Sequence, residues 1–119
     1  GAANFKGFGP TLADYPYFMR AMAGVKLAAA RANQSVGALI DRHADAIADA
    51  CDEIRDGAHW DQFIVPLAEG SGGTSTNMNF NEVIAARANQ IMGLAQDAPG
   101  GVTANDHVFV GFTVTFERG

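Results

Sequence analysis

The sequence predicts a mainly α-helical protein with an irregular or short β-like C-terminal tail. Three stretches carry apolar residues at steps of three and four, which is the period of one helix face. A glycine follows each stretch, as is common just beyond the last turn of a helix. The tail over 108–116 is instead rich in β-branched and aromatic residues, which favours a strand. We expect a single helical domain or fragment over 1–119, with helices at about 14–36, 41–56 and 79–92.

The first expected helix starts near Asp14, a short acid that can cap the first turn, with Pro16 close behind it. Gly37 is the expected stop. Between them, apolar residues recur at helical steps and predict the face that this helix buries. They are Phe18, Met22, Val25, Ala29 and Ala32.

The second expected helix has Asp41 as its candidate cap and Gly57 as its stop. Its apolar stripe consists of Ala44, Ile47, Ala48, Cys51 and Ile54, whereas His43, Asp45, Asp49, Asp52 and Arg55 lie mostly on other faces. Because Cys51 belongs to the apolar stripe, we expect a buried and unreactive thiol. Residues 58–69 hold several apolar side chains and Pro66, which predicts an extended, partly buried connection.

The third expected helix follows a glycine-rich turn at 70–76. Asn79 and, three residues on, Glu82 have the spacing of a capping box. Gly93 is the expected stop, and 97–101 form a turn. The residues that continue the helix are Val83, Ile84, Arg87, Ala88, Ile91 and Met92.

Composition and charge exclude several classes of protein. The chain has 8 basic and 13 acidic residues and a net charge of -5, so we expect no nucleic-acid partner. No apolar run approaches a membrane span and no secretory signal is evident, which favours a soluble, cytoplasmic protein without a membrane partner. A single cysteine excludes an internal disulfide framework. The first residue is Gly1 and not Met, which indicates a chain that is processed, tagged or cut from a longer one.

The turn at 70–76 is the strongest candidate for a binding site. Its hydroxyl side chains lie among glycines directly before a helix, where N–H groups without an intrahelical partner and the positive end of the helix dipole favour an anion. Serine and threonine donate to a carboxylate without titrating. The sequence therefore predicts a carboxylate or phosphate site, with a solvent-exposed loop as the alternative. No lysine follows the last glycine, so this turn is not a nucleotide P-loop.

The three histidines are His43, His59 and His107. No two of them have the spacing of a zinc pair on one helix, and we expect surface or structural roles, no metal site and no cofactor. Asp106 precedes His107 directly, but neighbours in sequence rarely face each other, which makes a catalytic dyad a poor interpretation.

Residues 70–85 resemble the first signature segment of the aspartase/fumarase superfamily, a Gly-Ser/Ala-Gly-Thr turn followed by Asn-Met-Asn-x-Asn-Glu-Val. Residues 14–33 and 46–54 resemble the first two helices of that family, and 105–108 resemble a later segment more faintly. The resemblance implies the helical N-terminal portion of a fumarase/aspartase-like fold. Both aspartate ammonia-lyase and class II fumarase remain open; the segment around Cys51 favours the former.

Members of this family form fumarate by anti-elimination. The resemblance implies that Ser71, Thr74 and Ser75 donate hydrogen bonds to a dicarboxylate substrate (aspartate, malate or fumarate), that Asn77 shapes the turn, and that Thr113 keeps a hydroxyl in the later segment. It also implies a homotetramer. No residue matches the serine base of the family, so we assign no catalytic residue and expect the chain to be inactive alone. A non-catalytic oligomerisation or interaction module is the alternative.

Two departures from the family pattern bear on this site. Gly73 is one glycine more than the family turn has, which shifts Thr74 relative to Ser71. The polar substrate-binding turn of the later segment is replaced by the mostly apolar 109–116.

Overall fold

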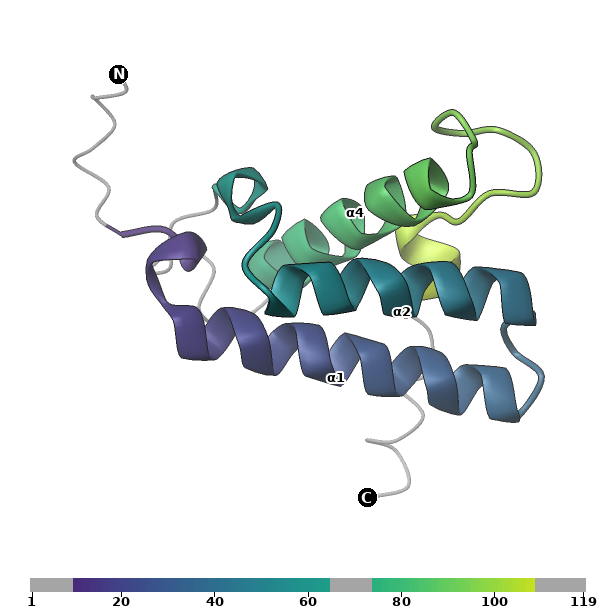
Figure 1. The fold of residues 1–119 in the computed structure, drawn as a ribbon, viewed down its shortest axis with the longest axis horizontal. Helices are drawn as coiled ribbons and strands as arrows, with labels where there is room; N and C mark the ends of the chain where they lie inside the picture. The colour runs from purple at the N-terminus through teal and green to yellow at the C-terminus, as the bar shows by residue number, and fades with distance from the viewer. Residues whose placement is uncertain (1–9, 65–73, 109–119) are drawn as a thin grey trace.

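The computed structural model describes residues 10–64 and 74–108, and within these ranges the chain is helical and contains no strand (Figure 1). The long helices are α1 (Pro16–Ser35), α2 (Asp41–Arg55) and α4 (Thr74–Ile91). The short elements are the 3-10 turns η2 (Leu12–Asp14) and η3 (Trp60–Gln62) and the π-helical turn η4 (Ala104–Val108). The predicted mainly α class is confirmed.

The three long helices enclose one core. The helices α1 and α2 lie side by side and antiparallel, α4 packs on α2, and η4 packs against α4 (Figure 1). Gly37 follows α1 and Gly93 follows α4 with positive φ angles of 83° and 79°. A side chain is strained in this left-handed region, which is why the sequence places glycine there.

The helix starts differ from the predicted ones. Asp14 lies in η2, where its carboxylate accepts the N–H of Thr11 at 3.0 Å, and does not cap α1. Asp41 is the first residue of α2 and not its cap. Its carboxylate accepts Nε2 of Gln34 at 2.8 Å, and a negative charge in this first turn still suits the helix dipole.

Asn79 lies inside α4, which begins at Thr74, so the predicted capping box with Glu82 is wrong. The amide Nδ2 of Asn79 donates instead to the carbonyl of Gln62 at 3.2 Å and ties α4 to η3. The predicted extended connection is also wrong over Trp60–Gln62, which is the turn η3, while 65–69 lie outside the described residues.

The buried stripe of α2 is the predicted one: all five of its apolar residues are buried. Cys51 is among them, and burial raises the pKa of its thiol to about 12, as expected for an unreactive cysteine.

The buried face of α1 is only partly the predicted one, since Phe18 and Met22 do pack against the core. Val25 and Ala32 are exposed, whereas the buried residues are Met19, Ala23, Lys26, Ala30 and Asn33. The prediction counted apolar residues, and the face that packs contains a lysine and an asparagine. Polar side chains can be buried when a neighbouring element supplies hydrogen bonds, which the sequence of α1 does not reveal.

Glu53 links α2 to α4 and to the segment before η3. Its carboxylate accepts Nε and Nη2 of Arg87 at 2.7 and 3.0 Å, and Nε2 of His59 at 2.6 Å. The hydrogen bonds from Arg87, with a smaller contribution from His59, lower the pKa of Glu53 to about 2. Arg87, which the sequence predicted only as part of the third helix, is therefore an ion-pair partner of Glu53.

We expect the Glu53 carboxylate to make the stability of the folded chain depend on pH under acidic conditions. The pKa of Glu53 in the folded state lies below the ordinary value of 4.5. Its contribution to the free energy of unfolding is therefore complete above about pH 4.5 and is lost as the pH falls towards 2. Glu53→Gln should lower Tm at pH 7 by about 2–5 °C and flatten this acid decline. Circular dichroism melts across this pH range measure both effects. The matched control is Asp49→Asn, an exposed carboxylate on the same helix; identical acid profiles for the two variants would contradict the expectation.

Candidate carboxylate site at the start of helix α4

The first turn of α4 contains the C-terminal part of the predicted anion-binding turn. Thr76 is buried, and Asn77 is half-buried and accepts a hydrogen bond from Nζ of Lys26 at 2.6 Å. Lys26 comes from the middle of α1 and is only 2% exposed. Burial lowers the pKa of its ammonium group. A helix start and a buried lysine thus meet at one place, and both favour an anion.

The structure describes the predicted site residues to different extents. Asn77 is fully described, and the backbone of Thr74 and Ser75 forms the beginning of α4. The side chains of Thr74 and Ser75 lie outside what is described, as do Ser71 and Thr113. The predicted strand over 108–116 is wrong at Val108, which is the last residue of η4, and 109–116 lie outside the described residues. The structure brings Thr74, Ser75 and Asn77 into one helical turn.

Two polar residues near this turn were not predicted as site residues. One is Lys26. The other is Asn81, which is 0% exposed, and neither atom of its side-chain amide has a hydrogen-bond partner among the described residues. Asn77 and Asn81 are four residues apart and lie on the same face of α4. The Asn-x-x-x-Asn spacing was visible in the sequence; that this face turns inward was not.

The faint second segment forms η4, and its histidine contacts other groups than the adjacent aspartate. Nδ1 of His107 accepts the N–H of Thr103 at 2.8 Å, and its ring lies edge-on to that of His43 with centroids 4.8 Å apart. Burial and then the nearby His43 lower the pKa of His107. Asp106 is exposed, and its N–H donates to Oγ1 of Thr103 at 3.1 Å. This geometry does not form an acid–imidazole dyad.

His43 was predicted on a polar face and is buried. Its Nε2 donates to the carbonyl of Gly100 at 2.9 Å, which holds the loop before η4 against α2.

Within 10–64 and 74–108, no three His, Cys, Asp or Glu side chains are grouped in a way that could hold a metal ion. None of the helices in this part of the chain combines the length and apolar character needed to cross a bilayer.

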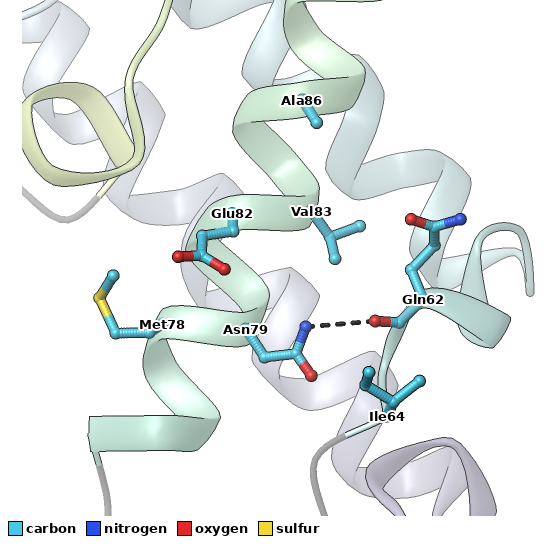
Figure 2. A pocket seen from close by; sticks show the side chains of 7 residues that line it. All are labelled: Gln62, Ile64, Met78, Asn79, Glu82, Val83 and Ala86. Carbon is cyan, nitrogen blue, oxygen red and sulfur yellow. Dashed lines mark hydrogen bonds between the residues drawn. The ribbon is translucent and has the colours of Figure 1, made fainter. Parts of the chain in front are cut away.

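A groove runs along another face of α4, beside η3 (Figure 2). It has a volume of about 490 Å³ and is lined by Gln62, Ile64, Met78, Asn79, Glu82, Val83 and Ala86. The hydrogen bond from Asn79 to the carbonyl of Gln62 crosses it in Figure 2. Glu82 places a carboxylate on its wall, which disfavours a dicarboxylate ligand. The groove is therefore a poorer candidate for the substrate site than the first turn of α4.

Fold and site together define an α-helical protein with a polar helix start beside a buried cation. The model of the lyase family matches residues 12–117, and the chain belongs to this family. The aspartate ammonia-lyase of Helicobacter pylori strain J99 is 45% identical over 105 residues, which are 88% of this chain and 22% of that enzyme. The class II fumarate hydratase of Halobacterium salinarum is 48% identical over 94 residues, 79% of this chain and 20% of that enzyme.

A solved structure agrees with these sequence matches. The fumarate lyase:delta crystallin of Brucella melitensis superposes with a TM-score of 0.79 at 42% identity, covering 84% of this chain and 23% of that one. The resemblance to the aspartase/fumarase superfamily is thus confirmed. The chain spans about a fifth of the length of the curated relatives that it matches.

Proposed function

We propose that this chain provides a carboxylate-binding segment of a lyase that forms fumarate by anti-elimination, as an aspartate ammonia-lyase does. The observation that carries the proposal is the 45% identity to the Helicobacter pylori aspartate ammonia-lyase over 88% of the chain. The 48% identity to a class II fumarate hydratase supports water, instead of ammonia, as the alternative leaving group. Aspartate, malate and fumarate are all small dicarboxylates, so one carboxylate site serves either reaction.

In this proposal the hydroxyls of Ser71, Thr74 and Ser75 donate hydrogen bonds to a substrate carboxylate, and Asn77 shapes the turn that carries them. Thr113 adds a hydroxyl from the later segment. When a base removes the proton beside that carboxylate, negative charge develops on its oxygens, and donors already aimed at them lower the barrier. No residue of this chain is assigned as the base, so the chain by itself is expected to be inactive.

The 119-residue chain should form no fumarate from aspartate or malate, as followed by fumarate absorbance. A chimaeric lyase, in which residues 12–117 replace the matching segment of the Helicobacter pylori aspartate ammonia-lyase, should turn over aspartate. In it, Thr74→Val and Ser75→Ala each remove one donor to a charged group and should lower kcat/KM about ten- to a hundredfold.

Ser35→Ala is the matched control, because it removes an exposed hydroxyl at the far end of α1. Turnover by the isolated chain would contradict the proposed inactivity. A well-folded chimaera without turnover, or one whose kcat/KM is the same in all three variants, would contradict the carboxylate site.

We further propose a cytoplasmic homotetramer as the working form. Large apolar side chains exposed on the chain support an association surface: Tyr17 is 90%, Val36 77% and Ile64 71% exposed. Light scattering should show self-association, and a monomer at high concentration would contradict it. Cell fractionation tests the compartment. A chain that associates while its chimaera stays inactive would favour the alternative, a non-catalytic oligomerisation module.

A further inference from the structure

We propose that His43 and His107 form an acid-sensitive latch, which holds η4 against α2 while His107 is neutral and releases η4 when His107 is protonated. The two imidazoles come from α2 and η4, and their rings lie edge-on with centroids 4.8 Å apart. The turn η4 also packs against α4 (Figure 1). This inference concerns the folded chain alone and does not depend on the proposed carboxylate site.

The hydrogen bond of His107 fixes its protonation state. Its Nδ1 lies 2.8 Å from the backbone nitrogen of Thr103, and an amide N–H donates only to a ring nitrogen that carries no proton. A second proton, taken up at Nδ1, would point at the Thr103 N–H, so the bond would become a contact between two donors. Oγ1 of Thr103 lies 3.3 Å from the same Nδ1, and a protonated ring bonds to it only by giving up the amide.

His43 supplies the other half of the latch. It is buried on α2, and its Nε2 donates to the carbonyl of Gly100 at 2.9 Å, in the loop that leads into η4. The ring that anchors this loop is also the ring against which His107 packs. A proton on His107 therefore places a cation against a buried imidazole, and when both rings are protonated two like charges repel each other at close range.

The charged groups around the pair act from α2 and from η4 itself. Burial and then the nearby His43 lower the pKa of His107, and the Asp106 carboxylate acts in the opposite direction. Asp106 is exposed, so water weakens its attraction. Arg42 of α2 adds a positive charge beside the loop, where its Nη1 would lie 3.9 Å from a Cβ atom at Gly100. The charged side chains of α1 and α4 are not among the groups that shift this pKa; they are Arg20, Lys26, Arg31, Glu82 and Arg87.

The direction of the pH dependence follows from the lowered pKa. The folded chain holds His107 neutral below its ordinary pKa of 6.5, whereas the released segment binds the proton more readily. The attachment of η4 is therefore complete above about pH 6.5 and weakens as the pH falls below that value. Release is local, because the apolar core between α2 and α4 does not titrate.

Nuclear magnetic resonance on the 119-residue chain tests the latch. The ring nitrogen signals of His107 should report an unprotonated Nδ1 at about pH 7.5 and should titrate below about pH 6.5. The protection factors of the Thr103 and His107 amides should fall about tenfold or more between about pH 7.5 and pH 5. Those of Ile47 and Ile54 in the core of α2 should change less than about threefold.

Two variants separate the halves of the latch. His107→Asn keeps a side-chain acceptor for the Thr103 N–H and cannot be protonated, so protection of that amide should no longer depend on pH. His43→Phe keeps an aromatic ring and removes the donor to Gly100, so protection should be lower at every pH and His107 should titrate closer to its ordinary value. The control is His59→Asn, which removes the histidine before η3 and should leave the decline at Thr103 as it is in the unmodified chain.

Equal protection of the Thr103 amide at about pH 7.5 and pH 5 would overturn the inference, as would a decline that His107→Asn retains. A decline of the same size at Ile47 and Ile54 would also overturn it, because the latch releases η4 alone. Should His43→Phe fail to fold, the comparison of His107→Asn with the unmodified chain decides by itself.

Discussion

Replacement of Phe80 by alanine is expected to lower the free energy of unfolding by about 3–5 kcal/mol. Phe80 is 0% exposed on the inward face of α4. Its ring centroid lies 4.5 Å from that of Phe63, next to η3, and 6.3 Å from that of Phe18 on α1, in an edge-on arrangement. The ring therefore joins three segments, and its removal leaves a cavity that none of them can fill without moving.

Urea unfolding followed by circular dichroism measures this loss. Phe80→Leu keeps most of the volume and should cost less than about half as much. The control is Tyr17→Ala, because Tyr17 is 90% exposed on α1 and its truncation should change stability by about 0.5 kcal/mol or less. Similar losses for Phe80→Ala and Tyr17→Ala would show that this aromatic cluster is not the centre of the core.

The second large effect is expected at Asn89, whose replacement by alanine should cost about 2–4 kcal/mol. Asn89 is 1% exposed. Its Nδ2 donates to the carbonyl of Val102 at 2.9 Å, and its Oδ1 accepts the N–H of the same residue at 2.8 Å. One side chain on α4 thus satisfies both backbone groups of a buried loop residue. Alanine removes both of these hydrogen bonds, and the loop that leads into η4 loses its attachment to α4 while His43 still holds it to α2.

Hydrogen exchange at the amide of Val102 tests this directly, since its protection should fall in Asn89→Ala while that of core amides in α2 changes less. The control Gln90→Ala alters the exposed neighbour on the same helix. Gly101→Ala should act in the same direction, because a Cβ atom there would lie 2.8 Å from Oδ1 of Asn89. Retained protection of Val102 in Asn89→Ala would contradict this account.

Several features could be predicted from the sequence because they depend on residues close together in the chain. The five residues of the predicted α2 stripe are apolar and buried, and most charged residues of the helix lie on its other faces, so local periodicity largely specifies its orientation, with the buried His43 as the exception. The left-handed positions after α1 and α4 require glycine whatever packs nearby. The family was recognised from a continuous motif at 70–85, which does not depend on knowing the fold.

The start of α4 was misplaced for a reason that is also local. Threonine, serine and asparagine favour helix caps and turns, so the sequence predicts 74–76 as the end of a turn and Asn79 as the helix cap. In the structure these residues lie in the first turn of the helix, and the side-chain amide of Asn79 donates a hydrogen bond to the carbonyl of Gln62 in η3. That bond exists only because η3 is folded beside α4.

The sequence by itself thus determined the helical class, the family and the candidate turn, because short-range patterns and a contiguous motif carry that information. Only the tertiary structure decided which polar side chains are buried. The partner of Lys26 is 51 positions away, that of His43 57, and that of Asn89 13. A buried polar group is tolerated when such a partner is present, and only the folded chain shows which distant segment supplies it.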